Sequence, residues 1–166
     1  MKRCIILRGP AGSGKTTLSK ELAKIYPLYH IELDILRKKI PREENEPKFS
    51  QEEKLRTNRI LIPLVREKLK AGQKVIIDEV FYYKSQLNEI KKEFSKEIII
   101  FNLTCPLELC LSRNRSRRSL GERKTTDEAT KTIHFLVSQL KEGIKIDTSN
   151  KTIQETLKEI ISNLEI

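Results

Sequence analysis

The feature that constrains this chain most is a short run near its beginning, Gly9 to Thr16, which reads Gly-Pro-Ala-Gly-Ser-Gly-Lys-Thr. This run fits the spacing G-x-x-x-x-G-K-[ST] of a phosphate-binding P-loop. Glycines let such a loop curl until successive backbone N–H groups point at phosphate oxygens, which larger side chains would obstruct. Because an apolar strand-length segment precedes the run and a helical pattern follows it, the sequence predicts a nucleotide-phosphate site at a strand-to-helix turn.

The P-loop gives its own residues distinct roles. We expect the Lys15 ammonium to lie against the β- and γ-phosphates of ATP, and the Thr16 hydroxyl to ligate the accompanying Mg²⁺. The positive N-terminal dipole of the following helix adds to the attraction. The other cofactor-binding positions are expected in the loop and the first helical turn, at Gly9, Ala11, Gly12, Ser13, Gly14 and Thr17.

Apolar runs of strand length alternate with longer segments of helical period, which is the pattern of β-α-β units. Together with the P-loop, this alternation predicts a three-layer α/β/α sandwich of the P-loop NTPase class, one domain over residues 1–166 with a parallel sheet in the order 2-3-1-4-5. We expect strands at residues 2–7, 28–32, 74–78, 97–103 and 143–147. We expect helices at residues 15–25, 34–40, 51–71, 86–94, 125–141 and 152–164, and another that begins after Pro106.

Charge and cysteine content bear on the class of binding partner and on the cellular compartment. There are 33 Lys and Arg against 23 Asp and Glu, a net charge of +10, which suits an anionic partner such as a nucleotide or nucleic acid. A solvated Lys- and Glu-rich surface explains the excess equally well. The odd count of three cysteines (Cys4, Cys105 and Cys110) fits neither a zinc site nor a disulfide framework, so we expect a reducing compartment. With no stretch long enough for a signal peptide or a membrane span, we expect a soluble cytoplasmic protein without a membrane partner.

A carboxylate and a guanidinium follow the second expected strand. Asp34 lies just beyond it, and Arg37 lies one helical turn further on, on the same face. The carboxyl ends of parallel strands line the ligand crevice of an open sheet, so this pair is expected opposite the P-loop. Asp34 would take the proton of an attacking hydroxyl, and Arg37 would hold an anionic group. The alternative is that Asp34 only caps the helix while Arg37 is solvated.

The third expected strand ends in acids, at Asp78 and Glu79, after the apolar residues Val75 to Ile77. Such a strand delivers a carboxylate to the Mg²⁺ shell in P-loop proteins, which makes Asp78 a second candidate metal ligand beside Thr16. Two consecutive acids are also what ring-forming ATPases use to activate water. The pair therefore leaves open a rival hypothesis, an ATP-hydrolysing switch of the AAA type.

A basic segment occupies residues 113–124 and holds Arg113, Arg115, Arg117, Arg118, Arg123 and Lys124. If a helix runs through it, Arg113 and Arg117 share a face and can reach one anion together. A flexible break at Gly121 follows, so the segment is expected to form a lid that closes over the triphosphate and excludes water. A solvated basic face, or a nucleic-acid patch unrelated to catalysis, is the alternative.

Histidines and tyrosines carry weaker signals. His30 lies within an expected strand and His134 within an expected helix. Neither is spaced from another residue in a way that indicates a catalytic partner, so we expect core or surface roles for both. Tyr82 and Tyr83 follow the third strand at the crevice rim. Stacking on an acceptor base is possible there, but packing is the expected role.

These residues resemble a group of small P-loop kinases, the kinase domains of phage-type 5′-hydroxyl polynucleotide kinases, and they are also similar to chloramphenicol-phosphotransferase-like and zeta-toxin-like kinases. The likeness rests on the P-loop, on Asp34-Ile35-Leu36-Arg37, on the strand that ends in Asp78, and on Arg113-Asn114-Arg115-Ser116-Arg117. The resemblance implies that Asp34 is the general base, that Arg117 acts on the transferring phosphate, and that Arg113 lies near the adenine. It further implies that Thr148 and Ser149 enclose the base.

The resulting hypothesis is an ATP:hydroxyl phosphotransferase that is monomeric or dimeric. The charge of +10 and the Arg-Asn-x-x-Arg pattern favour a polynucleotide 5′-hydroxyl, on RNA or DNA, as the first-choice acceptor. A small-molecule kinase of the same fold is the alternative, because the run Asp78 to Phe81 is closer to the small-molecule and toxin-like relatives. The AAA-type switch, and an RNA-binding module that uses nucleotide only structurally, remain as rivals.

Overall fold

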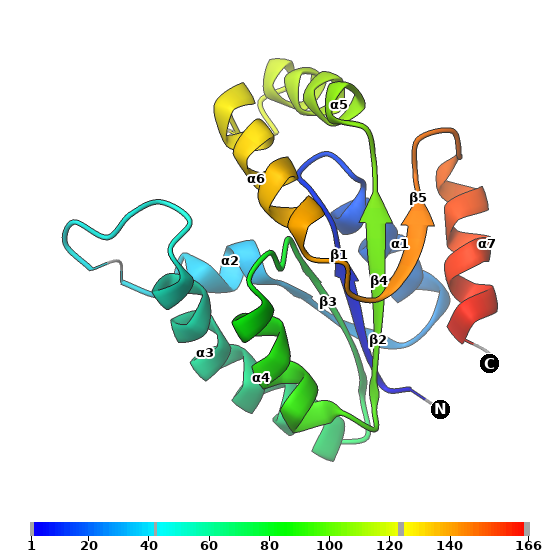
Figure 1. The fold of residues 1–166 in the computed structure, drawn as a ribbon. Helices are drawn as coiled ribbons and strands as arrows, with labels where there is room; N and C mark the ends of the chain where they lie inside the picture. Colours follow the sequence, from blue (N-terminus) through cyan, green and yellow to red (C-terminus); the bar gives the residue numbers. More distant parts are fainter. Residues whose placement is uncertain (1, 42, 123–124, 165–166) are drawn as a thin grey trace.

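A single parallel sheet forms the centre of the molecule. The computed structural model describes residues 2–41, 43–122 and 125–164 of the chain, and in this part five strands pair in the order β2-β3-β1-β4-β5 (Figure 1). The strands are β1 (Cys4–Arg8), β2 (Leu28–Glu32), β3 (Lys74–Glu79), β4 (Ile98–Thr104) and β5 (Ile144–Asp147). All four strand pairings are parallel. The expected fold class and strand order are therefore confirmed.

Helices connect the strands and cover the sheet. They are α1 (Lys15–Ile25), α2 (Leu33–Arg37), α3 (Gln51–Lys70), α4 (Lys84–Phe94), α5 (Leu107–Ser119), α6 (Asp127–Gln139) and α7 (Ile153–Leu164). The expected helix over residues 34–40 is too long, because α2 ends at Arg37. The N–H groups of Lys39 and Ile40 bond to carbonyls three residues back, and the residue before Pro41 disfavours helical dihedrals.

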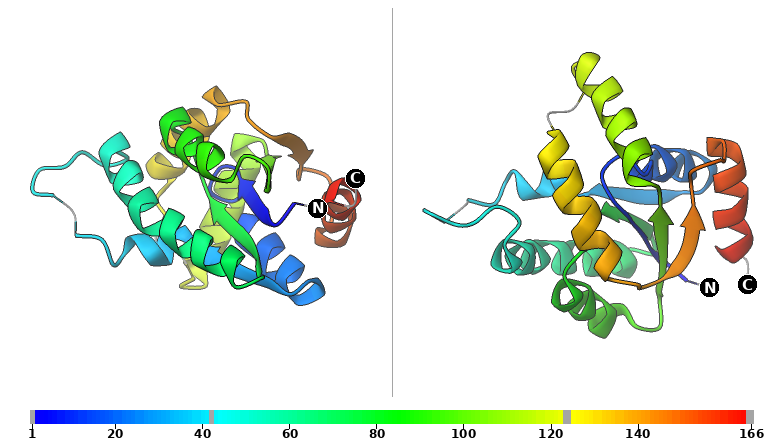
Figure 2. Two further views of the ribbon diagram at one scale, coloured as in Figure 1. Left: turned by 90° about the horizontal axis from the view of Figure 1, so that it is seen from below. Right: turned by 45° about the horizontal axis from the view of Figure 1, so that its top comes forward.

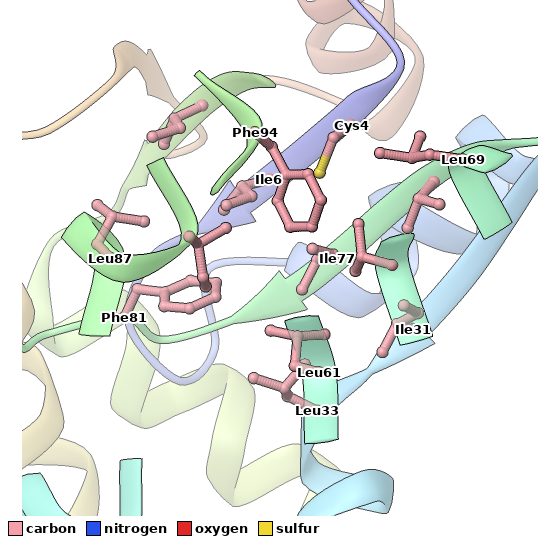
Figure 3. Packing of buried hydrophobic residues seen from close by; sticks show 14 of the residues in the cluster. Cys4, Ile6, Ile31, Leu33, Leu61, Leu69, Ile77, Phe81, Leu87 and Phe94 are labelled. Atoms are coloured by element: carbon pink, nitrogen blue, oxygen red, sulfur yellow. The ribbon is translucent and has the colours of Figure 1, made fainter. Parts of the chain in front are cut away.

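Alternation along the central strand divides the core into two layers. Cys4 and Ile6 of β1 pack beneath α3 and α4, in a cluster that includes Leu61 and Leu87 (Figure 3). Ile5 and Leu7 belong to the opposite cluster, which α1 and α7 cover (Figure 2). Successive side chains of a strand point to opposite faces, so the near-continuous apolar sequence of β1 is explained by burial on both sides.

The strand register brings the polar ends of three strands to one edge of the sheet. Asp78 of β3 pairs with Leu7 of β1 and with Glu32 of β2, and Glu79 pairs with Arg8. The P-loop begins directly after Arg8. The edge that holds the expected Mg²⁺ carboxylate is therefore the same edge that holds the phosphate loop.

Arg8 at the end of β1 is a fully buried arginine that sequence reasoning missed. Its guanidinium donates to the carbonyl oxygens of Val137 at 3.1 Å and Leu140 at 2.7 Å, around the C-terminus of α6. It also donates to the carbonyl of Phe81, 3.2 Å away, just after β3. Burial lowers the pKa of Arg8 to about 10. The partial negative charge of a helix C-terminus suits this cation, so Arg8 fastens α6 to the strand that carries the P-loop.

Replacing Arg8 with lysine should lower the free energy of unfolding by roughly 3 kcal/mol, because one ammonium cannot reach carbonyls in two separate segments and leaves buried acceptors without donors. Urea denaturation measures the change. The half-exposed Arg3, which donates to the Leu69 carbonyl and to Glu97, gives the control. Arg3→Lys should cost under about 1 kcal/mol, and equal losses for the two variants would contradict the role given to Arg8.

Within the described residues, every helix is too short or too polar to cross a lipid bilayer.

Candidate active site

The P-loop curls between β1 and α1 because two of its glycines adopt dihedrals that other residues avoid. Gly12 has a φ of 88°, and a Cβ at this position would lie 2.7 Å from the carbonyl oxygen of Cys110 in α5. Gly14 has a φ of 92° and forms the N-cap of α1. A left-handed residue at each place turns the backbone sharply, and the backbone N–H groups of the first turn of α1 complete an anion-binding cradle.

Lys15 and Thr16 stand at the start of α1, where the motif requires them. The Lys15 ammonium is buried and donates to the carbonyl oxygen of Pro10, 2.8 Å away, across its own loop. The Thr16 hydroxyl lies 3.4 Å from Oδ1 of Asp78. Hydroxyl and carboxylate oxygens are the hard ligands that Mg²⁺ prefers, so the two residues expected to serve the metal do come together.

His30 holds the other oxygen of the Asp78 carboxylate. Its Nε2 lies 2.8 Å from Oδ2 of Asp78, and both side chains are largely buried. No spacing in the sequence indicated this partner for His30, for which we expected a core or surface role. The contact follows from register, because Asp78 pairs with Glu32, and His30 lies two residues before Glu32 on the same face of β2. The contact between His30 and Asp78 could have been predicted only by knowing that β2 pairs with β3.

Changing His30 to alanine should raise the Mg²⁺ concentration needed for half-maximal ATP binding by about tenfold, because a partner that orients a metal-binding carboxylate is lost. Mg²⁺ titrations of ATP binding by calorimetry measure this. His30→Gln is the matched control, since its amide can still donate to Asp78, and it should stay within about threefold of the original protein. A Mg²⁺ requirement that is the same in all three proteins would show that His30 only packs.

Arg37 of α2 is surrounded by carboxylates. Its guanidinium donates to Asp34, 3.0 Å away, makes an ion pair with Glu79, and lies 3.8 Å from Glu53 of α3. The N-cap of α2 is Glu32, so the alternative in which Asp34 only caps a helix is wrong. Three carboxylates share the Arg37 charge, and their fields raise its pKa against the opposing effect of burial. The guanidinium therefore positions these acids, and its expected contact with an anionic group on the acceptor or the transferring phosphoryl stays a prediction.

A cavity of about 270 Å³ lies between this cluster and the P-loop. Lys15 and Asp78 reach it from the phosphate side, and Asp34 and Arg37 from α2. The remaining wall comes from the P-loop, the loop before α3, α3, the end of β3 with the residues after it, and α6 with the residue Thr125 before it. It consists of Ala11, Lys48, Phe49, Glu53, Lys54, Glu79, Val80, Tyr82, Thr125 and Ile133. A molecule in this space would have one end beside the phosphate loop.

Lys54 and Glu53 are cavity residues that sequence reasoning missed, because they looked like ordinary surface positions of a charged helix. The Lys54 ammonium is buried, 4.0 Å from Oε1 of Glu79 and 5.2 Å from the centre of the Tyr82 ring. Burial lowers the pKa of Lys54, while Glu79 opposes that shift. Nothing in the sequence pattern distinguishes Lys54 from neighbouring lysines. Only its burial in the structure does.

The two tyrosines after β3 pack as expected. Tyr82 is buried, and its ring meets those of Phe49 and Tyr83 edge-on, at centroid distances of 6.4 Å and 4.9 Å. The Tyr83 hydroxyl donates to the Phe49 carbonyl at 2.6 Å. These contacts hold the end of the loop before α3 against the cavity of about 270 Å³, which is called the acceptor cavity below after the role that we propose for it.

A second cavity of about 540 Å³ lies on the opposite side of the P-loop, between α5 and the start of α7. Arg113 spans it, donating to the carbonyl oxygens of Gly12 at 3.2 Å and Thr148 at 3.1 Å. Arg113, Arg117 and Thr148 all line it, so the structure brings together three of the residues expected at the nucleotide. Ser149 turns away to Asp147, whose carboxylate accepts from its N–H at 2.9 Å, so the structure does not bring Ser149 to this cavity.

The basic segment begins in the second half of α5 and continues past its end at Ser119, and the charges of its described residues are partly neutralised. Arg115 and Arg118 both pair with Asp127 at the start of α6, and Arg117 lies 3.3 Å from Glu122. Arg117 reaches the nucleotide side but does not line the acceptor cavity. Arg123 and Lys124, the last cations of the expected lid, lie outside the described residues.

Comparisons with known proteins agree with this geometry. The model of a family described as AAA domain matches residues 4–139. A protein of Archaeoglobus fulgidus named "Probable adenylyl-sulfate kinase" is 29% identical over 116 residues, which cover 69% of this chain and 74% of that protein. An unliganded sugar kinase from Janibacter sp. HTCC2649 has a similar structure, with a TM-score of 0.75, 18% identity, and coverage of 100% of this chain and 96% of the other.

A chain in the Pnkp1/Rnl/Hen1 RNA repair complex is also similar, with a TM-score of 0.66 and 18% identity over 83% of this chain and 44% of the other. At such identities the likeness concerns the fold.

A phosphate cradle, a carboxylate at the end of the neighbouring strand and a separate cavity beside them define a P-loop kinase, and the relatives are named as kinases. Because the family model covers most of its length, the chain belongs to the AAA domain family. The narrower resemblance to phage-type polynucleotide kinases is not confirmed.

Proposed function

We propose that this P-loop kinase transfers the γ-phosphate of ATP to a hydroxyl of a small molecule. The observation that carries the proposal is the cavity of about 270 Å³ that Lys15 and Asp78 enter from one side and Asp34 from the other. A space of this size suits a metabolite rather than a polymer. The small-molecule alternative thus takes the place of the polynucleotide 5′-hydroxyl that the sequence put first.

The charge in the acceptor cavity supports a polar acceptor without strong net charge. Leaving aside Lys15 and Asp78, which face the phosphates, the wall holds three cations and three carboxylates: Arg37, Lys48 and Lys54 against Asp34, Glu53 and Glu79. A polyanion would find little net attraction there. Arg115 and Arg118 of the basic segment, which contribute to the net charge of +10, are paired with Asp127.

Each candidate residue has a role in this transfer. Asp34 would accept the proton of the acceptor hydroxyl, while Arg37, itself held by Glu79, keeps the Asp34 carboxylate in place. Lys15 would exchange the Pro10 carbonyl for the β- and γ-phosphates, and Thr16 and Asp78 would hold Mg²⁺, which neutralises phosphate charge when bound. Arg117 would reach the transferring phosphate from α5, with Arg113 and Thr148 beside the base.

The arrangement around Glu79 favours transfer over the rival reading, an ATP-hydrolysing switch. A water-activating glutamate needs a free carboxylate, but both oxygens of Glu79 are engaged. One pairs with Arg37, and the other accepts from the N–H of Val80 at 2.8 Å. Asp34, whose side chain is 62% exposed, is better placed to accept a proton.

ADP release in the presence of Mg²⁺ and ATP, measured across a panel of acceptors, tests the proposal. The panel comprises sugar acids, sugars, nucleosides, adenylyl sulfate and 5′-hydroxyl oligonucleotides, with Lys15→Ala as the inactive control. We expect Lys15-dependent ADP release with a small hydroxylated compound and none with the oligonucleotides. Transfer of labelled phosphate to an oligonucleotide end, with no small acceptor active, would return the polynucleotide reading to first place.

A further inference from the structure

We propose that Cys105 and Cys110 form a peroxide-sensitive thiol pair behind the P-loop, which closes to a disulfide and thereby weakens ATP binding. Cys105 follows β4, and Cys110 lies in the second turn of α5. Neither residue has a part in phosphate transfer. Both are free cysteines in a chain whose third cysteine, Cys4, lies in the core.

Helix geometry places the two cysteines side by side at the start of α5. Pro106 is the N-cap of α5, so Cys105 precedes the cap and Cys110 is the fourth helical residue. Side chains at these two positions pack against each other at helix starts. The Cys110 thiol donates a hydrogen bond to the Cys105 carbonyl oxygen, 3.9 Å away. A disulfide then requires the two side chains to rotate until their sulfur atoms meet.

The surroundings favour the thiolate of Cys105. The neighbouring Cys110 thiol lowers the pKa of Cys105, and the Arg113 guanidinium, 3.5 Å from the sulfur, and the Thr148 hydroxyl lower it further. Burial and the nearby Asp147 act in the opposite direction. His134 of α6 is the other titratable group beside it, with Nε2 bonded to the Cys105 carbonyl at 2.8 Å. Burial raises the pKa of Cys4 to about 12, so that thiol should stay inert.

A small reagent has a path to Cys105. A cavity of about 420 Å³ lies between the end of β4 and α6, with Cys105, Pro10 and His134 in its wall and Lys141 and Lys145 also lining it. This cavity is separate from both the nucleotide and the acceptor cavities. A molecule as small as hydrogen peroxide can therefore reach the sulfur without passing through the active site.

The reaction is a two-electron oxidation with a hydroperoxide as the oxidant. The Cys105 thiolate attacks the peroxide, the O–O bond breaks, and hydroxide or alkoxide leaves as the sulfenic acid forms. The Cys110 sulfur, having given up its proton, then attacks the Cys105 sulfur, the S–O bond breaks, and the departing hydroxide takes up the proton as water. Two thiols are oxidised to one disulfide, and one peroxide is reduced to water and an alcohol or a second water.

The pair is mechanically connected to the phosphate loop. Gly12 packs so closely on Cys110 that a Cβ would lie 2.7 Å from its carbonyl oxygen. Arg113 donates from the same nitrogen to the Cys105 sulfur and to the Gly12 carbonyl. Closing the disulfide removes the thiolate that faces Arg113 and pulls on the first turns of α5. Both changes act on the loop that binds phosphate. Because such coupling is reciprocal, bound ATP should disfavour formation of the disulfide by the same factor by which the disulfide weakens ATP binding.

Mass spectrometry of a tryptic digest of the labelled protein tests the pair, because trypsin places Cys4 in a different peptide from Cys105 and Cys110. The peptide of residues 97–113 contains Cys105 and Cys110, and Cys4 lies in the separate peptide 4–8. We expect iodoacetamide to label the 97–113 peptide at least about tenfold faster than the Cys4 peptide near neutral pH, with a pH midpoint below the value of about 8.5 for a free thiol. Labelling of this peptide no faster than Cys4 would overturn the proposal.

The second measurement is peroxide treatment followed by ATP binding. Hydrogen peroxide should lower the mass of the 97–113 peptide by two hydrogens and weaken ATP binding by about tenfold, and dithiothreitol should reverse both changes. Cys110→Ala should stop at a sulfenic acid and show no disulfide, and ATP should slow the oxidation of the original protein. A disulfide that forms while ATP affinity stays constant would refute the coupling, and failure of the disulfide to form would refute the pair.

Discussion

Replacing Asp34 with asparagine should reduce phosphate transfer by about 10²–10⁴-fold, while ATP affinity changes by less than about twofold. Asparagine keeps the size of the side chain but cannot accept the proton of the acceptor hydroxyl. The Asp34 side chain lines the acceptor cavity and is not among the residues that line the cavity beside α5, so ATP binding should not depend on it. Single-turnover transfer and calorimetric ATP titration measure the two quantities on the same sample.

A neighbouring acid provides the control for that experiment. Glu44 is exposed in the loop before α3, and Glu44→Gln removes the same charge without touching the cavity. Its transfer rate should stay within about twofold of the original rate. Transfer by Asp34→Asn at a comparable rate would show that another group accepts the proton.

Changing Glu79 to glutamine should lower the free energy of unfolding by about 3 kcal/mol, because Arg37 and Lys54 would lose their shared counter-ion inside the protein. Glu79 is the most deeply buried of these three side chains, at 2% exposure. Transfer should fall as well, since Arg37 would no longer be fixed beside Asp34. Urea denaturation and the transfer assay together report both effects.

A second Arg–Glu pair serves as the control, because it has the same charges as the Arg37–Glu79 pair but lies near the surface. Glu97 pairs with Arg3 near the surface, with exposures of 32% and 39%, so Glu97→Gln should cost under about 1 kcal/mol. A loss for Glu79→Gln no greater than that for Glu97→Gln would mean that the Arg37 cluster contributes no more than an ordinary surface pair.

The parts of the molecule that were predictable are those that local patterns encode. The spacing of Gly9 to Thr16 located the phosphate loop, and helical period placed α1 at residues 15–25, its observed bounds. The apolar run that ends in Asp78 placed β3 and its carboxylate. Each of these signals lies within a few consecutive residues, so no knowledge of the tertiary structure was needed.

The contacts that escaped prediction join residues that are distant in sequence. His30 and Asp78 are 48 positions apart, and Arg8 and Leu140 are 132 positions apart. Such pairs depend on strand order and helix docking together, and a single sequence carries no local trace of them. Arg37 illustrates the same limit. Its spacing from Asp34 could be seen in the sequence, but its ion pair with Glu79 could not.

The anchoring of α6 has a consequence for how the two substrates communicate. Arg8 fastens one end of this helix, and Asp127 at the other end pairs with Arg115 and Arg118 of α5. Ile133, between the two ends, lines the acceptor cavity. A displacement of α5 by incoming ATP is therefore passed along α6 to the wall that the acceptor touches, and the two substrates should show synergy, each binding more tightly when the other is present.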